Sequence, residues 1–468
     1  MVRKPSGLED VGTCATGPAM VHGAYPAGRV RHWRSGHSTR SRPDRHRQAL
    51  SSQRPRVDAP SASAPLPSRA PMTEPRSAAS SPPRPLLVRF GAMGDLVLVQ
   101  PMIRLLSERF GAPVDILSAG GWVRPLYEGQ PGVGEIFLLK KRKLPWWLSA
   151  EKRALLAGLR ARGPRPVWYC DFDEKLLPLL ARAGLGDDCV VRARAVGMRD
   201  GEHLVDFHQR VALQMPERFA AWTAFRSQTR TAGLTSQSDS QPNSQPPDGE
   251  HARGVHEAGS AQDEHISQAM QDPTLHISPA MQADVKDWLG SHQWLGRPLI
   301  LVQAGNRRTM RTGVRRRMST NTKWWPEENW AAVIRMLAGR HPEAVILLVG
   351  APPEADLNDE LLQRAGVPSA FNVATELPIP RLLALQARAA GMVTVDTGPG
   401  HTAAAVGCPL VVLFGVADPV EIRPRGGCTP VHVLQAFREG RPDMTAITVA
   451  EVTQAWDRLS LRAGANAT

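Results

Sequence analysis

An aspartate between an apolar strand and a helix is the first candidate for chemistry in this chain. The sequence Leu86-Leu-Val-Arg-Phe-Gly-Ala-Met-Gly-Asp95 runs from an apolar segment through a glycine-containing turn to a carboxylate, and an apolar helical pattern follows. Open α/β sheets present reactive groups at such a position, the carboxyl edge of a strand. A carboxylate there can also simply cap the helix by accepting its unpaired amides. The residues alone leave both interpretations open.

Two common nucleotide-binding loops are excluded at this turn. A dinucleotide-binding loop needs G-x-G-x-x-G, and a P-loop needs G-x-x-x-x-G-K-[ST]. The turn Gly91-Ala-Met-Gly94-Asp95 fits neither pattern, and no Lys-Ser or Lys-Thr follows it. The chain therefore does not carry an ordinary NAD or ATPase loop here.

Alternating strand and helix patterns predict two α/β lobes. Strands that alternate with helices form parallel sheets, because parallel neighbours need crossover connections. The predicted strands are Leu86–Phe90, Val114–Leu117, Glu135–Leu139, Val167–Asp171, Leu299–Gln303, Ala344–Val349, Met392–Asp396 and Leu410–Phe414. The predicted helices are Asp95–Arg109, Trp122–Glu128, Ala150–Ala161, Lys175–Ala183, 203–226, Pro326–Gly339, Glu354–Arg364, Ile379–Ala390, Pro399–Val406 and Ala450–Arg462. Two such lobes facing each other would form a cleft lined by the carboxyl ends of both sheets.

Changes in composition divide the chain into four parts. Residues 1–84 are rich in Arg, Ser, Pro and Ala, and residues 227–281 are mostly polar. Neither segment has the apolar periodicity that would offset the entropy cost of ordering. We predict a disordered basic tail at 1–84, a Rossmann-like lobe at 85–226, a disordered linker or insert at 227–281, and a second Rossmann-like lobe at 282–468.

The net charge of +13 is concentrated outside the predicted lobes. Residues 1–85 hold 14 Lys or Arg against 5 Asp or Glu, which leaves +4 for the rest. A cluster of arginines between Arg307 and Arg317 more than accounts for that remainder. The folded body is therefore nearly neutral, so we predict no nucleic acid partner.

Cysteine usage and hydropathy indicate a cytoplasmic protein. The five cysteines are scattered and form no C-x-x-C pair, which argues against a disulfide framework and a zinc site. No apolar run approaches the ~20 residues that span a bilayer. We expect a soluble protein that contacts a membrane at most peripherally.

Five short motifs follow one another along the chain: Gly94-Asp95, Lys323-Trp-Trp-Pro326, Gly350-Ala-Pro-Pro-Glu354, Asp396-Thr-Gly-Pro-Gly-His401 and Phe414-Gly-Val-Ala-Asp-Pro419. Taken in this order, they resemble the motifs of glycosyltransferase family 9, the ADP-heptose:lipopolysaccharide heptosyltransferases. The resemblance covers roughly residues 86–226 and 283–435. It implies a GT-B fold, with an acceptor lobe at 85–226 and a nucleotide-sugar lobe at 282–468.

The resemblance also implies an activity and its partners. The activity is a metal-independent, inverting transfer of a sugar from a nucleotide-sugar donor, ADP-heptose in the family's name, to a hydroxyl of the lipopolysaccharide core. No cofactor and no metal site are expected. The partners are the donor and the lipopolysaccharide-core acceptor, with peripheral contact at the inner face of the inner membrane.

Inverting transfer assigns roles to the matching residues. It needs a base on the face opposite the leaving diphosphate, and the resemblance gives this role to Asp95. Without a metal, helix N-terminal amides and a cation must stabilise the leaving group. The donor-binding residues implied in this way are Lys323, Glu354, Asp396, Thr397, Gly398 and His401. The neighbouring tryptophans, Trp324, Trp325 and Trp330, are interpreted as packing residues.

The chain departs from the family pattern, and these departures leave alternatives open. An Arg-rich insertion separates Gln303-Ala-Gly-Asn306 from Lys323. Those arginines could bind phosphates of a lipid-linked acceptor or an anionic membrane, or could form a solvated loop. Asp171-Phe-Asp173 resembles a metal-binding Asp-x-Asp motif, although a strand end is the favoured interpretation. The alternative functions are a catalytically silent sugar-nucleotide or lipopolysaccharide-binding module, and a family 9 transferase with a different donor sugar.

Overall fold

The structure is a computed structural model that describes residues 83–140, 144–222, 271–309 and 321–462. Most of the predicted tail (1–84) and of the predicted insert (227–281) lies outside these described ranges. The elements before the insert are β1 (Leu86–Val88), α1 (Met93–Phe110), β2 (Val114–Ser118), α2 (Val123–Tyr127), β3 (Val133–Leu138), η1 (Trp146–Leu148), α3 (Ala150–Ala161), β4 (Val167–Tyr169), η2 (Glu174–Leu176), α4 (Leu177–Arg182), η3 (Asp187–Cys189), β5 (Val190–Arg192), α5 (Ala193–Val196), α6 (Leu204–Leu213) and η4 (Glu217–Phe219).

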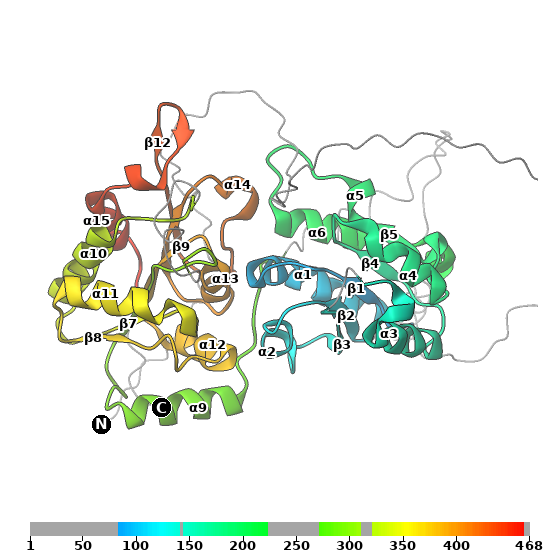
Figure 1. The fold of residues 1–468 in the computed structure, drawn as a ribbon, viewed down its shortest axis with the longest axis horizontal. Helices are drawn as coiled ribbons and strands as arrows, with labels where there is room; N and C mark the ends of the chain where they lie inside the picture. Colours follow the sequence, from blue (N-terminus) through cyan, green and yellow to red (C-terminus); the bar gives the residue numbers. More distant parts are fainter. Residues whose placement is uncertain (1–82, 141–143, 223–270, 310–320, 463–468) are drawn as a thin grey trace, which may run out of the picture. The chain divides into compact units, whose positions relative to one another are not determined.

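The elements after the insert form the second lobe (Figure 1). They are α9 (Pro279–Ser291), β6 (Leu299–Gln303), α10 (Glu327–Arg340), β7 (Val345–Leu348), η6 (Pro352–Glu354), α11 (Ala355–Ala365), β8 (Ala370–Asn372), α12 (Ile379–Arg388), β9 (Gly391–Val395), α13 (Gly398–Ala405), β10 (Leu410–Phe414), α14 (Pro419–Ile422), β11 (Val431–Gln435), β12 (Phe437–Arg438), β13 (Arg441–Pro442), η7 (Met444–Ala446) and α15 (Val449–Asp457). Among the helices in the described ranges, none combines the length and apolar character needed to cross a membrane.

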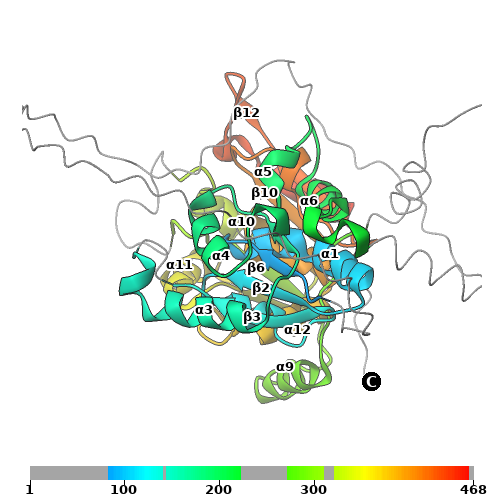
Figure 2. The same cartoon turned by 90° about the vertical axis from the view of Figure 1, so that its right-hand side faces the viewer.

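The N-terminal lobe contains a parallel sheet with the strand order β3-β2-β1-β4-β5. Successive side chains point to opposite faces of the sheet, and all residues of the three central strands β2, β1 and β4 are buried, so both faces are covered there. Leu87 and Trp168 pack with α1 and α6, whereas Leu86 and Tyr169 pack with α3 and α4. Figures 1 and 2 both show α1 beside α6. The order reverses between β1 and β4, and open α/β sheets have their ligand-binding crevice beyond the carboxyl ends of the strands at such a point.

The C-terminal lobe contains a second parallel sheet, with the order β11-β10-β9-β6-β7-β8. One face packs on α10, α11 and α15, and the other on α9, α12 and α13. The order reverses between β6 and β9, which places the residues after these two strands at the corresponding crevice. The predicted α/β architecture with two parallel sheets is confirmed.

A segment before α9 connects the two lobes by hydrogen bonds. The backbone N–H of Thr274 donates to Oε1 of Gln100 at 3.0 Å, and that of Leu275 donates to the carbonyl of Ala405 at 3.0 Å. Gln130 and His276 exchange two further hydrogen bonds, each of 2.8–2.9 Å. Residues 271–278 and the start of α9 at Pro279 thus fall inside the predicted insert. The second lobe begins earlier than the boundary expected from composition, because side-chain amides of the first lobe pair with the backbone of this polar segment.

Candidate functional site

Asp95 lies in the first turn of α1, and its carboxylate accepts two hydrogen bonds. Oδ2 accepts from the backbone N–H of Ala92 at 2.7 Å, and Oδ1 accepts from Nη2 of Arg89 at 3.1 Å. The contact with Ala92 caps the helix through Oδ2, whereas Oδ1 takes no part in capping. The Asp95 side chain is still 29% exposed, and each oxygen keeps a second lone pair. Capping and chemistry are therefore compatible at this residue.

Arg89 is a site residue that the sequence reasoning missed. Its side chain is 5% exposed, and Nη1 donates to the carbonyl of Cys170 at 2.8 Å. Its guanidinium also lies 5.9 Å from the centroid of the Phe172 ring. These contacts fix one guanidinium nitrogen beside Asp95. A charged residue directly after an otherwise buried apolar strand was the available signal.

The first turn of α13 is the second part of the site. Thr397 is its N-cap residue, but its side chain makes no capping hydrogen bond. The Thr397 hydroxyl instead donates to Oε1 of Gln303 at 2.6 Å, which joins the ends of β6 and β9. The amides near Thr397 and Gly398 thus lie at a helix N-terminus without a side-chain cap, the type of end that binds anions.

Lys323 and His401 flank the buried carboxylate of Asp396. Nζ of Lys323 lies 2.6 Å from Oδ2 and 2.5 Å from the backbone carbonyl of Asp396. Nε2 of His401 lies 3.8 Å from Oδ1, which is an ion-pair distance and not a hydrogen bond. The structure therefore brings three predicted residues together and places Lys323 at the N-terminal end of α13. Lys323 is thus paired with a buried carboxylate and keeps 35% of its side chain exposed.

The charge state of Asp396 follows from this arrangement. Burial alone would raise its pKa, but contact with His401 and the positive charge of Lys323 outweigh burial and lower the pKa below its ordinary value. Nδ1 of His401 is buried and has no hydrogen-bond partner among the described residues. A buried ring nitrogen without a partner is uncommon in folded proteins.

Glu354 lies at the carboxyl end of β7 in an arrangement that repeats that of Asp95. Its Oε2 accepts from the backbone N–H of Ala351 at 2.7 Å, just as Asp95 accepts from Ala92. Both carboxylates thus cap a helix from within a Gly-Ala-x-x-acid sequence. Burial raises the pKa of Glu354. Gly305 passes so close that a side chain there would overlap the Glu354 carboxylate.

The N-terminal ends of α1 and α13 contact each other. A Cβ atom added at Gly94 would lie 2.6 Å from Cδ2 of His401, and one added at Gly398 would lie 2.9 Å from Cβ of Met93. Glycine is therefore required at both positions for this approach. Asp95 follows Gly94 directly, so the N-terminal end of α1 that bears Asp95 lies close to the N-terminal end of α13.

The segment around Lys323 is held by packing. Trp325 and Trp330 are buried, and their rings meet edge to face with centroids 5.1 Å apart. Nε1 of Trp325 donates to the carbonyl of Ile447 at 2.9 Å. The predicted packing role of these two tryptophans is confirmed. Gly415 provides space for the carbonyl of Thr322, which a side chain would overlap.

Two other features lie apart from these residues. Asp173 caps η2 by accepting from the backbone N–H of Lys175 at 3.2 Å, which supports the strand-end interpretation of the Asp-x-Asp sequence. Across the residues that the structure describes, no group of three His, Cys, Asp or Glu side chains is arranged to hold a metal ion. Most of the predicted arginine cluster, 310–317, lies outside the described ranges.

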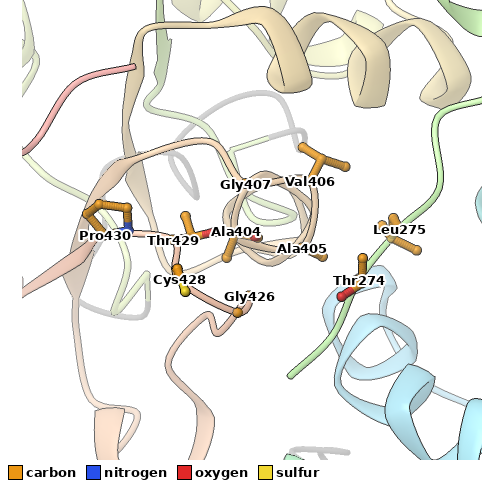
Figure 3. Close-up of a pocket in the computed structure, with 11 residues that line it drawn as sticks. Thr274, Leu275, Ala404, Ala405, Val406, Gly407, Gly426, Cys428, Thr429 and Pro430 are labelled. Atoms are coloured by element: carbon orange, nitrogen blue, oxygen red, sulfur yellow. Dashed lines mark hydrogen bonds between the residues drawn. The ribbon is translucent and has the colours of Figure 1, made fainter. Parts of the chain in front are cut away.

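A pocket of about 460 Å³ opens at the other end of α13 (Figure 3). Its walls include Thr274 and Leu275 of the connecting segment, the last turn of α13, and the loop that contains Cys428 and Thr429. None of the predicted site residues lines it. This pocket is therefore separate from the candidate site, which lies at the first turn of the same helix.

The sequence profile of glycosyltransferase family 9 (heptosyltransferase) matches residues 309–436. The matched range contains Lys323, Glu354 and the whole Asp396–His401 motif. Over these residues the chain is similar to glycosyltransferase family 9. Asp95 lies outside the matched range, so its place in the site rests on the geometry described above.

Curated relatives and solved structures are also similar to this chain. A lipopolysaccharide heptosyltransferase 3 of Escherichia coli is 29% identical over 161 residues, which are 34% of this chain and 43% of that protein. A second heptosyltransferase 3, from E. coli K12, is 31% identical over 22% of this chain and 30% of its own length. The aligned part of the chain thus spans less than half of each curated relative.

The solved structures match over a larger part of the chain. The match to E. coli ADP-heptose lipopolysaccharide heptosyltransferase II covers 80% of this chain and 97% of that protein's chain, with a TM-score of 0.55 and 18% identity. The match to a family 9 glycosyltransferase of Veillonella parvula covers 80% of this chain and 96% of that protein's chain, with a TM-score of 0.57 and 14% identity. At these identities the likeness shows the fold, and it extends across both lobes.

Proposed function

We propose that this protein is a family 9 glycosyltransferase that transfers a sugar, heptose from ADP-heptose, to a hydroxyl of a lipopolysaccharide core with inversion and without a metal. One observation carries the proposal: the α1 end that bears Asp95 contacts the α13 end that bears His401. Inverting transfer needs a base and a leaving-group site on opposite sides of one sugar. The heptosyltransferase names of the curated relatives support the choice of donor and acceptor.

Asp95 acts as the general base in this proposal. The acceptor hydroxyl gives its proton to an Asp95 oxygen while its own oxygen attacks the anomeric carbon. Arg89 and the Ala92 amide each occupy one lone pair of the carboxylate. They hold its orientation while the exposed side remains open to the acceptor.

The leaving nucleoside diphosphate is bound at the first turn of α13. The bond between the anomeric carbon and the diphosphate oxygen breaks, and the oxygen keeps the electron pair. Amides near Thr397 and Gly398 and the ammonium of Lys323 stabilise the added charge. Asp396 holds Lys323 at this position, and His401 is available to donate a hydrogen bond. Glu354 accepts hydrogen bonds from the ribose hydroxyls.

Donor specificity and turnover test this proposal together. Purified protein is incubated with ADP-heptose, GDP- and UDP-sugars and a heptose-free core acceptor, and both the glycosylated product and the released nucleotide are measured. We expect product with ADP-heptose, and thermal stabilisation by ADP above that by GDP or UDP. Stabilisation by ADP-heptose without transfer to any core acceptor would favour the silent binding module. Transfer from another nucleotide sugar alone would favour the different-donor alternative.

Lys323→Met provides a variant specific to the leaving-group site. Loss of the ammonium should lower both donor affinity and turnover, whereas Lys175→Met, which alters an exposed lysine paired with Asp173 in the other lobe, should leave both unchanged. Equal behaviour of the two variants would contradict the role of Lys323.

A further inference from the structure

Exposed apolar side chains gather on the segment between β3 and α3. Among the described residues of the N-terminal lobe, the exposed large apolar side chains are Trp122, Leu144, Trp147, Leu148 and Phe172. Three of the five belong to residues 144–148, where Trp147 and Leu148 are 60% and 66% exposed. We call Leu144, Trp147 and Leu148 the apolar tip. Such contiguous exposure is unusual for a soluble protein surface and indicates a binding function.

The apolar tip is held in place through its backbone, and the Trp147 ring meets that of Trp146 edge to face with centroids 6.1 Å apart. The buried side chain of Lys152 donates to the carbonyl of Leu144 at 2.6 Å, and Arg153 donates to the carbonyl of Trp147 at 2.5 Å. Trp146, between them, turns inward and packs 5.2 Å from the guanidinium of Arg182. The side chains of Trp147 and Leu148 consequently point away from the lobe on a fixed support. Exposure here is built into the local structure.

Positive charge adjoins the apolar tip. The exposed Lys140 lies two residues after the end of β3. Arg153 is exposed on the following helix. A tryptophan and leucines beside cations such as Lys140 and Arg153 are typical of protein segments that enter the interface of an anionic bilayer. An aromatic ring with a polar edge also suits the headgroup level.

We propose that the apolar tip and Lys140 dock the N-terminal lobe on an anionic lipid bilayer, with Trp147 and Leu148 inserted at the headgroup level. The purpose of this docking, to bring the enzyme to a membrane-embedded acceptor, rests on the proposed function, whereas the docking surface itself does not. The tip and Asp95 follow β3 and β1 at the same carboxyl edge of one sheet, with β2 between these strands. At ~4.8 Å per strand, the two strand ends are about 10 Å apart across the sheet.

Vesicle binding tests the docking surface directly. The full chain is sedimented with vesicles of phosphatidylcholine alone and of phosphatidylcholine with phosphatidylglycerol. We expect binding to the anionic vesicles that weakens with added salt, and at least about a tenfold lower partition coefficient for Trp147→Ser/Leu148→Ser. Lys140→Gln should lower it by a smaller factor, about fivefold at low salt.

The matched control removes similar apolar side chains elsewhere. Phe437 and Leu295 of the C-terminal lobe are 45% and 46% exposed, so Leu295→Ser/Phe437→Ser deletes one aromatic and one leucine of comparable exposure. This control should bind vesicles like the parent protein. Equal loss in both double variants, or no loss in Trp147→Ser/Leu148→Ser, would overturn the proposal. A change of oligomeric state with unchanged vesicle binding would instead assign the tip to self-association and also overturn it.

Activity on two acceptor forms separates this inference from the proposed function. Trp147→Ser/Leu148→Ser should keep its turnover on a lipid-free core oligosaccharide and lose at least about tenfold on the same acceptor embedded in vesicles. If no variant transfers sugar to either acceptor, the proposed function fails while the vesicle-binding result still decides the docking surface. Equal loss of turnover on both acceptors would contradict docking as the role of the tip.

Discussion

Replacing Arg89 by methionine tests whether a buried cation orients the proposed base. Methionine has a similar length and keeps the packing against the sheet, but it removes the hydrogen bonds to the Cys170 carbonyl and to Asp95. The carbonyl then loses a buried charged donor, which costs about 1–3 kcal/mol. We therefore expect the free energy of unfolding to fall by about 1–3 kcal/mol, measured by urea denaturation with an unchanged slope.

The catalytic effect of Arg89→Met should exceed what the loss of stability explains. Asp95 would keep only the Ala92 amide as a partner, so its second oxygen could rotate away from the acceptor. A displacement of about 1 Å in a positioned group costs roughly 10²-fold in rate. We expect kcat to fall by about 10- to 100-fold at temperatures where the variant is fully folded, with the donor KM within about threefold. Arg89→Lys should lie between the parent and Arg89→Met, because an ammonium can maintain one of the two bonds.

A double-mutant cycle decides between positioning and a general structural effect. If Arg89 acts through Asp95, then Arg89→Met should lower turnover by less than about threefold in a protein that already carries Asp95→Asn. The same fold-decrease in both backgrounds would refute the reasoning. So would parental turnover in the single variant Arg89→Met.

Three further predictions concern other parts of the site and the fold. Gly94→Ala should lower kcat/KM for transfer by roughly 10²-fold with little change in thermal stability, because the new methyl group meets His401; parental activity would show that the contact between the two helix ends is not needed. Burial raises the pKa of Glu354, so its ionised form destabilises the fold as the pH rises through the raised folded-state value. Near neutral pH the free energy of unfolding of Glu354→Gln should therefore exceed that of the parent by about 0.5–2 kcal/mol, as measured by urea denaturation. This difference should disappear below the unfolded pKa of about 4.3, and the variant should bind donor more weakly. Equal stability of the two proteins at both pH values would contradict it. Asp115→Asn removes a fully buried carboxylate that pairs with two arginines at the opposite end of β2, so it should cost about 3–5 kcal/mol in unfolding free energy while the turnover of folded protein stays unchanged.

Continuous apolar segments with clear turn signals made much of the fold predictable. The predicted bounds of Leu299–Gln303, Leu410–Phe414 and Ala150–Ala161 agree with β6, β10 and α3. A strand buried on both faces is apolar throughout, and a helix that begins at a serine cap has a defined start. These local signals do not depend on distant parts of the chain.

The missed strands of the two parallel sheets lie at their edges, and β12 and β13, also missed, pair only with each other. β5 and β8 have three residues each, and β11 is only partly buried along its length. An edge strand has one neighbour and needs no continuous apolar run. The pairing of such segments is decided by the strand beside them, Val167–Tyr169 in the case of β5. Sequence patterns within the segments therefore could not reveal them.

The individual motifs of the site could be predicted, but their partners could not. Asp95 and Asp396 each stand after an apolar strand, which is a local feature of the sequence. The ion pair between Lys323 and Asp396 joins residues 73 positions apart, and the contact of Gly94 with His401 joins different lobes. The first pair arises from the tertiary packing of the C-terminal lobe, and the second from the contact between the two lobes. Arg89 was closer to prediction, since an arginine that ends a buried strand requires a partner.

Turnover of Asp95→Asn with ADP-heptose and a core acceptor tests the central claim most directly. Asparagine keeps the shape of the side chain, and its Oδ1 can still accept from the Ala92 amide, so the helix cap is preserved while the basic oxygen pair is lost. The account predicts that the purified variant binds donor like the parent and transfers sugar about 10²- to 10⁴-fold more slowly. Near-parental turnover by this variant, with normal donor binding, would contradict it.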